Sequence, residues 1–379
     1  MRHRTEHEEA DEMTTLLHCA DIHLSQKEKD YSLSVIDEII EIALTHGVNA
    51  LLFCGDTFDS FEDAVIMRQA FRERIRRLPQ ECEIFLLAGN HEYLRRRANE
   101  SLAQYDFGIP KENIIEGGMW KLFQREGFEI LAIPHQSDYR SYAEWDIPEK
   151  QQPVRIAIAH GVLSGLSFTG FDDEEDERAA VMDIDLFIRH SVDYAAFGHL
   201  HSIQHHQIGR VDVVYPGSAR VWRANEFGPH HVVLVTCGAT VTHQPIAVKA
   251  AGRFRTYRLF VNFIGDTPAL PDDAEQWHPA DWIALSFFGV VEDETTAREN
   301  IQHLVNQVKS KIRRVETDVD DIKVLANIST QPLAKKFFDL WNEKKPVAAD
   351  PAWPAWQRAL ELGLLKIMEI IKNTEKFEA

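Results

Sequence analysis

Short polar clusters that combine histidine, aspartate and asparagine recur in the first half of this chain and could bind metal ions. Each cluster directly follows an apolar run that is typical of a β-strand. The candidate ligands are Asp21, His23, Asp56, Asn90, His160, His199 and His201. Seven ligands are more than one ion needs, and they suit two ions that share a bridging carboxylate. Such a centre is typical of the hydrolysis of phosphate esters.

The types of the candidate ligands narrow the choice of metal. Nitrogen and oxygen ligands suit Mn²⁺, Fe²⁺ or Zn²⁺, and the lack of cysteine ligands disfavours a purely structural zinc site. Asp56 follows Gly55 at an expected strand end, so its carboxylate is the candidate bridge. Asn90 adds a neutral oxygen, which limits the negative charge where an anionic phosphate must enter. His91, next to Asn90, is free to act as an acid or to stabilise charge.

Alternating strand and helix patterns would position these ligands. Strands are expected at 16–20, 50–54, 84–87, 128–133, 155–159 and 194–197, helices at 31–45 and 64–78, and antiparallel strands at 211–215 and 231–236. Ligands of open α/β sheets bind beyond the carboxyl ends of the strands, which is where every candidate lies. The sequence therefore predicts an α/β fold in which distant residues converge on one site.

The pattern changes near residues 245–252. Strands at 254–263, 282–288 and 315–324 and an amphipathic helix at 296–310 predict a smaller α+β unit. Two further helices are expected at 333–341 and 356–371, on either side of a segment rich in Pro and Ala. We divide the chain into a flexible tail (1–12), a main domain (13–250), the smaller unit (251–330) and a helical segment (331–379).

Composition excludes several classes of protein. The 379 residues carry a formal net charge of −19, which argues against non-specific adhesion to nucleic acid, although bound cations can still make a local positive site. No run reaches the ~18 apolar residues of a membrane span, and the charged residues 1–12 lack the apolar stretch of a secretory signal. The four cysteines are isolated, so we expect a reducing, cytoplasmic location without membrane contact.

Some polar residues near the clusters have two candidate roles. Asp59 could cap the helix that follows it or support the metal ligands. His135 fits a structural role better than a ligand role, and His205 and His206 are expected at the surface.

Trp356, near the end of the chain, fits an internal core and a docking surface equally well.

Basic residues gather at two places in the first half. Arg95, Arg96 and Arg97 directly follow the Asn90 motif and are candidate contacts for substrate phosphate, although they could also begin a solvated helix. The arginines between residues 72 and 77 are expected to form a solvated helix face. An acidic run at 172–177 would repel DNA if it faced the site.

The order of the motifs resembles that of the calcineurin-like metallophosphoesterase superfamily. The motifs are Asp-x-His, Gly-Asp, Gly-Asn-His-Glu, a single His and Gly-His-x-His, and the resemblance covers about residues 14–245. Within the superfamily, the chain is most similar to the SbcD-type nuclease subunit of the SbcCD complex, which repairs DNA double-strand breaks. The segments that carry this similarity are HCADIHL, FCGDTFD, LAGNHE, AHGVLSG, FGHLHSIQ and YPGSAR.

This resemblance implies a fold and a role for each site residue. The fold would be a two-sheet metallophosphoesterase sandwich flanked by helices, with a smaller α+β capping domain and a C-terminal helical segment. By motif position, Asp21, His23, Asp56 and His201 would hold one ion, and Asp56, Asn90, His160 and His199 the other. The ions are expected to be Mn²⁺, and His91 would assist departure of the leaving oxygen.

The resemblance also implies a substrate and partners. The main domain would be a DNA exonuclease and endonuclease that acts at DNA ends in double-strand-break repair. The smaller unit would cap the DNA, and the helical segment would dock on the coiled coil of an SMC-like ATPase of the SbcC type. The nuclease is expected to form a homodimer within a heterotetramer.

Two other functions stay open at this point. The same metal site would serve a metallophosphoesterase that acts on small nucleotides or other phosphoesters, although such an enzyme has less use for residues 253–379. A non-enzymatic scaffold is disfavoured, because all seven candidate ligands and His91 are present.

Overall fold

The computed structural model describes residues 13–94, 99–135, 139–164, 180–262, 265–324, 332–346 and most of 351–370. The predicted tail 1–12, the candidate substrate contacts Arg95, Arg96 and Arg97, and the acidic run 172–177 lie outside the described residues. The chain divides into two compact units, 1–253 and 254–379, and each is described by itself. None of the described helices is long and apolar enough to cross a membrane.

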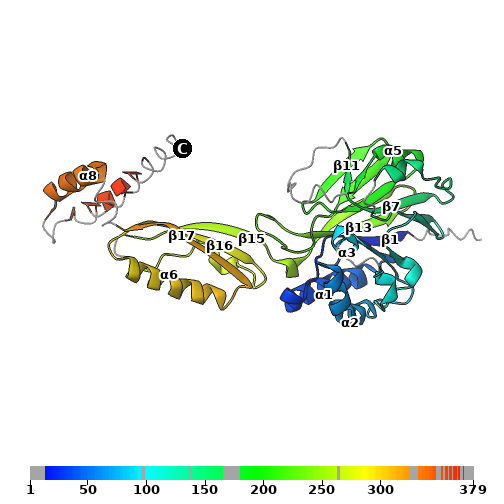
Figure 1. Ribbon diagram of the computed structural model, residues 1–379, viewed down its shortest axis with the longest axis horizontal. Coiled ribbons are helices and arrows are strands. Elements are labelled where there is room, and N and C mark those ends of the chain that lie inside the picture. Colours follow the sequence, from blue (N-terminus) through cyan, green and yellow to red (C-terminus); the bar gives the residue numbers. More distant parts are fainter. Residues whose placement is uncertain are drawn as a thin grey trace, which may run out of the picture. The chain divides into compact units, whose positions relative to one another are not determined.

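The larger unit contains two six-stranded mixed sheets (Figure 1). The first sheet has the order β14 (Val241–Ala247), β13 (His231–Cys237), β1 (Thr14–Cys19), β2 (Ala50–Cys54), β3 (Glu83–Leu87) and β4 (Ile114–Ile115). The second has the order β11 (Gln204–Ile208), β12 (Val211–Tyr215), β10 (Tyr194–Gly198), β7 (Val154–His160), β6 (Phe128–Ala132) and β5 (Lys121–Gln124). The predicted two-sheet fold is confirmed.

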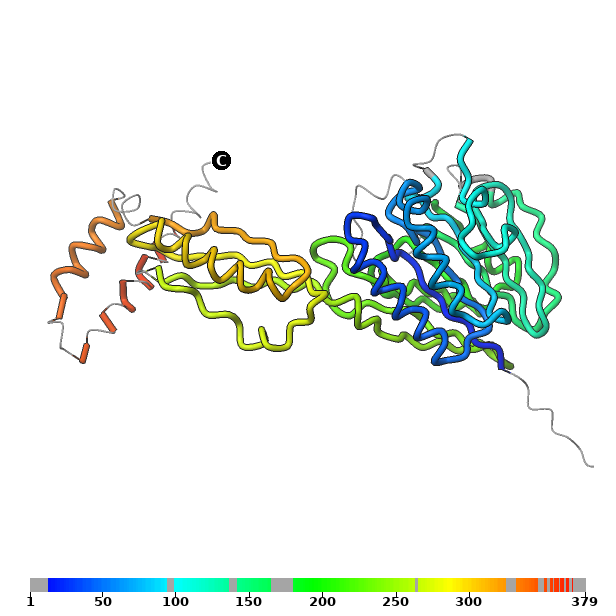
Figure 2. Tube along the Cα trace, turned by 90° about the horizontal axis from the view of Figure 1, so that it is seen from below, coloured from blue at the N-terminus to red at the C-terminus, as the bar shows by residue number. Residues whose placement is uncertain are grey.

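The two sheets pack face to face around an apolar core. This core takes Leu16, Leu52 and Phe85 from the first sheet and Ile130 and Ile156 from the second. Because side chains alternate along a strand, the other half of each strand points to the outer faces. There α1 (Lys29–His46) and α2 (Phe61–Ile75) lie side by side over the first sheet, and α5 (Ile184–Arg189) packs on the second (Figures 1 and 2).

Parallel strands at the centre of each sheet bring the polar clusters to the same end of the sandwich. In the first sheet β1, β2, β3 and β4 run parallel, and in the second β12, β10, β7 and β6 do so. Strand β12 is antiparallel only to β11, whereas β13 is antiparallel to both of its neighbours. The expectation of an antiparallel strand at 211–215 is therefore half right, because the pairing with β10 is parallel.

Arg155 and Glu129 form a buried ion pair in the second sheet of the larger unit. Arg155 donates from Nε to Glu129 at 2.5 Å, and both side chains have no exposed surface. Arg155 also donates to the carbonyl oxygens of His190 at 2.7 Å and Pro148 at 2.9 Å. A buried cation needs such a full set of acceptors, because desolvation otherwise exceeds the Coulomb attraction. The pair therefore fixes the loops at 148 and 190 against β6 and β7.

The smaller unit is a three-stranded sheet with helices. Strands β15 (Phe254–Phe260), β16 (Trp282–Val291) and β17 (Arg314–Val324) lie in that order, and all pairs are parallel. Helix α6 (Glu294–Lys309) connects β16 to β17 and packs its apolar side on the sheet (Figure 1). Asp293 caps this helix by accepting from the backbone N–H groups of Thr295 and Thr296, both at 3.1 Å.

The helices at the end of the chain pack on each other. Helix α8 (Pro332–Glu343) is followed by residues 355–370, which are helical wherever the structure describes them. The indole rings of Trp341 and Trp356 stack at 3.7 Å, and each ring nitrogen donates to the other residue's carbonyl oxygen. Trp341 also packs against an apolar cluster that contains the buried Leu360. Trp356 is half-buried and packs on Trp341, which favours a role inside this segment, while Trp353 lies outside the described residues.

Removing one partner of the buried ion pair should destabilise the fold. We expect Arg155→Met to lower the free energy of unfolding by about 3–5 kcal/mol, because the Glu129 carboxylate would be buried without a cation. The double variant Arg155→Met with Glu129→Leu should lose clearly less. Urea unfolding followed by circular dichroism measures both. A loss below ~1 kcal/mol in the single variant would contradict this account of the pair.

Candidate metal centre

The seven predicted ligands converge at one end of the sandwich. Asp21, Asp56 and Asn90 follow the ends of β1, β2 and β3 in the first sheet. His160 ends β7, and His199 follows β10 in the second sheet, where the residues His160 and Gly198 are directly paired. Each sheet therefore contributes ligands to a site between the strand ends, as the parallel order predicts.

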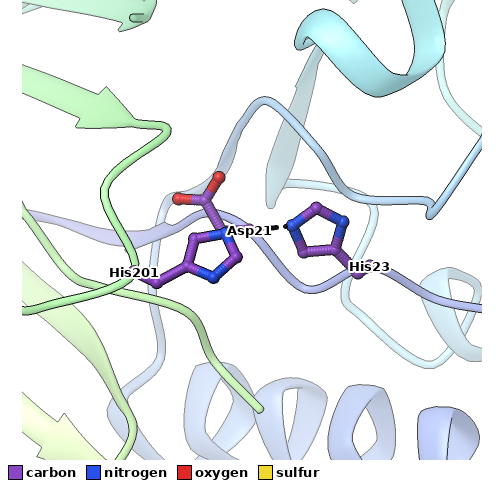
Figure 3. Close-up of side chains that lie close together, drawn as sticks. All are labelled: Asp21, His23 and His201. Carbon is purple, nitrogen blue, oxygen red and sulfur yellow. Dashed lines mark hydrogen bonds between the residues drawn. The ribbon is translucent and has the colours of Figure 1, made fainter. Parts of the chain in front are cut away.

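One group of ligands consists of Asp21, His23 and His201 (Figure 3). Their side chains are almost fully buried, and the Nε2 atoms of His23 and His201 lie 3.2 Å apart. The Asp21 carboxylate accepts from the backbone N–H of His199 at 2.9 Å. Two ring nitrogens that ligate one zinc or manganese ion at about 2.1 Å would have about this separation.

A second group surrounds the side chain of Asn90. The Oδ1 atom of Asn90 lies 2.9 Å from Nε2 of His160 and 3.2 Å from Nδ1 of His199. The Nε2 atom of His160 is also 3.3 Å from the Asp56 carboxylate. The Asp56 carboxylate also lies within 4.8 Å of ligand atoms of Asp21 and His23, which belong to the first group. The structure therefore places Asp56 where one carboxylate could contact two ions.

Burial and charge oppose each other in this centre. Burial raises the pKa of Asp21 to about 7, against the attraction of the His160 and His201 rings. Burial also opposes ionisation of Asp56, but the neighbouring His160 and His91 outweigh it and hold the pKa of Asp56 well below its ordinary value. Although burial lowers the pKa of His160, its contact with Asp56 raises it to about 10.

These pKa shifts indicate that the centre favours a bound positive charge. Without a cation, a proton on His160 offsets the charge of the Asp56 carboxylate. A metal ion would replace that proton, since a ligating histidine must be neutral. The carbonyl oxygen of Cys54 accepts from Nδ1 of His160 at 3.0 Å, which leaves Nε2 to face the other ligands. The residues present thus fit divalent ions.

The backbone of the ligand loops is strained. Asp21, His23, Asp56 and His199 have φ angles of 51°, 48°, 46° and 103°, a region that non-glycine residues rarely adopt. Such strain persists only where the surroundings enforce it, and it gathers at functional sites.

Two glycines next to the ligands are required by close packing. A Cβ atom at Gly55 would lie 2.0 Å from Nδ1 of His160, and one at Gly89 would lie 2.1 Å from the Asp56 carboxylate. Gly55 also has a φ of 89°. These positions let the loops after β2 and β3 approach each other closely enough to share one centre.

The side chain of His91 faces the centre with a defined tautomer. Its Nδ1 lies 2.9 Å from the carbonyl oxygen of Asp59, which can only accept, so Nδ1 carries a proton. Its Nε2 lies 3.9 Å from the Asp56 carboxylate. The backbone N–H of His91 donates to the other oxygen of that carboxylate at 2.9 Å. His91 can therefore present a second proton on Nε2 to a bound substrate.

Glu226 supports the centre and was not expected from the sequence. Its carboxylate accepts a close hydrogen bond from Nδ1 of His201, which keeps the Nε2 lone pair of that ring directed at His23. Burial opposes its ionisation, but His201 outweighs burial and lowers the pKa of Glu226 to about 2. The backbone N–H of Trp222 donates to the same carboxylate at 2.7 Å.

Trp222 donates hydrogen bonds to both Glu226 and Asp59. Its indole stacks on the His23 ring at 4.2 Å and donates from Nε1 to Asp59 at 2.8 Å. The residue that caps α2 is Ser60, whose side-chain oxygen accepts from the backbone N–H of Asp63 at 3.0 Å. Of the two candidate roles of Asp59, the structure therefore favours support of the ligands. No sequence signal marks Trp222 or Glu226, because each is a lone residue in the loop after YPGSAR.

Glu92 ties two ligand loops together. Its buried carboxylate accepts from the backbone N–H groups of Phe58 at 2.8 Å and Gly89 at 2.9 Å. These donors belong to the loops that carry Asp56 and Asn90. Burial raises the pKa of Glu92 to about 8, and the nearby Asp56 adds to this shift. The conformation of both loops thus depends on one side chain.

The other residues named in the sequence analysis are not candidate ligands of this metal centre. Within the segment 72–77, Arg72 pairs with Asp106, and Arg74 and Arg77 pair with Asp37 of α1. The predicted solvated helix face is therefore only partly right, because these side chains are held in ion pairs and Arg77 lies beyond the end of α2. His135 is buried with its ring 6.3 Å from that of His160, and burial lowers its pKa to about 4. On strand β11, His205 is exposed as predicted, whereas His206 is half-buried.

Comparison with known proteins agrees with this geometry. Residues 14–202 match the family model of the calcineurin-like phosphoesterases. This chain belongs to the calcineurin-like metallophosphoesterase superfamily. The grouped histidine and aspartate ligands agree with a phosphoesterase that uses divalent metal ions. The predicted superfamily is confirmed, whereas the SbcD-type branch, the number of ions and the choice of Mn²⁺ stay predictions.

Curated relatives are similar over part of their length. The uncharacterized metallophosphoesterase YhaO of Bacillus subtilis is 24% identical over 253 residues, which are 59% of this chain and 58% of YhaO. The DNA double-strand break repair protein Mre11 of Thermoplasma acidophilum is 26% identical over 223 residues, 55% of this chain and 57% of that protein. The SbcD component of the Escherichia coli nuclease SbcCD is 32% identical over 84 residues, 20% of this chain and 21% of SbcD. The chain thus spans less than two thirds of each.

Solved structures are similar in fold only. The purple acid phosphatase of yellow lupin has a TM-score of 0.42 and 16% identity, covering 64% of this chain and 52% of its own. A dimetal phosphatase from Danio rerio has a TM-score of 0.38 and 11% identity, covering 62% and 99% respectively.

The charge on Glu226 should matter for metal binding. We expect Glu226→Gln to weaken Mn²⁺ binding about 10–100-fold, because His201 would lose the anion that fixes its ring and raises its basicity. Calorimetric titration of the metal-free chain with Mn²⁺ measures this. The exposed Glu62→Gln serves as control and should bind as the wild type does. Affinity within twofold of the wild type in Glu226→Gln would refute the supporting role.

Proposed function

We propose that this chain is a DNA nuclease that hydrolyses phosphodiester bonds with two divalent ions, preferably Mn²⁺. The observation that carries the proposal is the pair of ligand groups that share Asp56, with His91 beside them. When bound, the ions would supply Lewis-acid activation of water and stabilise charge on the phosphate oxygens. Asp21, His23 and His201 would hold one ion, and Asn90, His160 and His199 the other, with Asp56 common to both.

The residues of the chain have distinct tasks in this reaction. The hydrogen bond from Nδ1 to the Asp59 carbonyl orients His91, so that Nε2 can deliver a proton to the oxygen that leaves phosphorus. Glu226 and the Cys54 carbonyl hold the rings of His201 and His160 in their ligating tautomers. The stacked ring of Trp222 covers His23 and limits the access of water to it.

DNA is favoured as substrate by two observations. The chain is locally similar to two proteins that are named for DNA break repair and for nuclease activity. It also carries a second unit that supplies none of the grouped ligands, and we propose that this unit caps DNA. The alternative is a phosphoesterase for small nucleotides, which the net charge of −19 favours over a long polyanion.

Degradation of end-labelled duplex DNA in Mn²⁺, beside a panel of small phosphodiesters and phosphomonoesters, separates the two substrates. We expect Mn²⁺-dependent DNA cleavage that falls about 10²–10⁴-fold in His91→Ala, because the leaving oxygen would lose its proton donor. His46→Ala, an exposed change on α1, should cleave as the wild type does.

Turnover of small esters without DNA cleavage, with the partner ATPase present, would move the function to the alternative. Full DNA cleavage by His91→Ala would instead refute the role of that residue.

We also propose that the C-terminal helices dock on an SMC-like ATPase of the SbcC type, within a heterotetramer that contains a homodimer of this chain in the cytoplasm. Leu333 and Leu340, one face of α8, are 48% and 52% exposed. A helix with such an unpartnered apolar stripe suits a partner helix.

Sedimentation of the full chain mixed with the ATPase tests this assembly. We expect a complex with two copies of each protein, and we expect Leu340→Asp to weaken it at least about tenfold, because a buried charge opposes apolar docking. Asn342→Asp adds the same charge to another side of α8 and should leave the complex intact. A strict monomer that binds no ATPase would contradict both parts.

A further inference from the structure

A second group of possible metal ligands lies at the open edge of the sandwich. It consists of His205 on β11, Asp212 on β12 and His243 on β14. One ligand atom from each residue lies within 4.8 Å of the other two. None of the three belongs to the metal centre, and the phosphoesterase reaction uses none of them.

Strand register explains why these three side chains face each other. His205 pairs with Val214 and Asp212 with Gln207, so all four share one face of the second sheet. Val214 lies in the core between the sheets, so this face is the inner one. In the first sheet His243 pairs with Val235, which is in the same core.

His205 and Asp212 therefore lie on the inner face of the second sheet, and His243 lies on the inner face of the first, each near the edge of its sheet. Strands β11 and β14 are the first strands of their sheets and have no further strand beside them among the described residues. Their inner faces meet where the apolar core ends, and there the sequence supplies two imidazoles and a carboxylate. The rings of His205 and His243 are 4.6 Å apart at 72°, across the gap between the sheets.

The geometry of the group resembles that of ligands around a tetrahedral ion. The Nε2 atom of His205 lies 3.3 Å from Oδ1 of Asp212. Two ligands that each contact a zinc ion at about 2.0–2.1 Å in tetrahedral geometry stand about 3.3–3.4 Å apart. The side chain of His205 is 46% exposed and that of Asp212 is 19% exposed, so an ion could enter from solvent and keep water as a further ligand.

We propose that His205, Asp212 and His243 form a zinc site that joins the edge strands of the two sheets. Two imidazoles with one carboxylate suit Zn²⁺ better than Mn²⁺, which prefers a shell of oxygen atoms. The ion links β11 to β14, between which no strand pairing exists among the described residues. It thereby closes the edge of the sandwich in the folded state and stabilises that state by mass action.

His243 is ready to bind a metal ion near neutral pH. Burial lowers the pKa of His243 below its ordinary value, helped by the neighbouring His205, so the ring is neutral and can ligate. His243 also packs against Tyr194 at 5.9 Å, which limits the positions that its ring can take. A preformed ligand loses less entropy when the ion binds.

Counting bound zinc in the full chain tests the proposal. The metal-free protein is dialysed against micromolar Zn²⁺, and zinc is measured by atomic emission in the wild type and in His243→Gln and Asp212→Asn. We expect each variant to hold one zinc ion fewer than the wild type. The control His206→Gln, on the same strand but on its opposite face, should hold as many as the wild type.

A second measurement does not depend on any variant. Anomalous scattering at the zinc edge from crystals of the zinc-loaded wild type should place an ion among the three side chains. Zinc should also raise the unfolding temperature less in the two variants than in His206→Gln, while circular dichroism and Mn²⁺-dependent ester hydrolysis confirm that they are folded. Equal zinc counts in all proteins, or no anomalous peak at this edge, would overturn the proposal and leave a simple His–Asp pair.

Discussion

The structure of the larger unit depends on placing one carboxylate, that of Asp56, inside a group of imidazoles. A buried carboxylate is costly unless cations and hydrogen-bond donors surround it. Here His160 lies 3.3 Å away and the backbone N–H of His91 donates at 2.9 Å. Around this point the ends of β1, β2 and β3 from one sheet meet those of β7 and β10 from the other. The two sheets must therefore keep a fixed separation and order for the centre to exist.

That requirement explains the local strain and the surrounding support. The left-handed backbone of Asp21, His23 and Asp56 departs from extended strand geometry at the positions of the ligands. Glycines at 55 and 89 allow the loops to approach without collision. Glu92 then fastens two loops through their N–H groups. Strain in the loops is thus offset by hydrogen bonds that need the complete fold.

The sandwich carries two groups of possible metal ligands, one at the strand ends and one at an edge of the sheets. At the strand ends, the parallel order concentrates buried oxygen and nitrogen atoms suited to divalent ions. At the edge, between β11 and β14, period-two alternation brings a partly exposed histidine pair and a carboxylate together. The second unit has its own core under α6, so its packing is independent of either place.

The sequence by itself determined most of the regular elements and the candidate ligands. Central strands and helices lie within a few residues of their expected places, because buried apolar periodicity survives in any environment. The edge strands β5, β11 and β14 were not expected, since half-exposed strands carry mixed polar sequences. All seven candidate ligands could be named because each is a histidine, aspartate or asparagine at or just beyond a strand end.

Only the tertiary structure decided the support of these ligands and the pairing across the gap. Glu226 and Trp222 reach His201 and His23 from a loop with no motif, and Asp59 is a supporting residue rather than a helix cap. His205 and His243 are 38 positions apart in the numbering and meet only because two separate sheets end side by side. Contacts between distant segments depend on the relative placement of the sheets, which local periodicity does not encode.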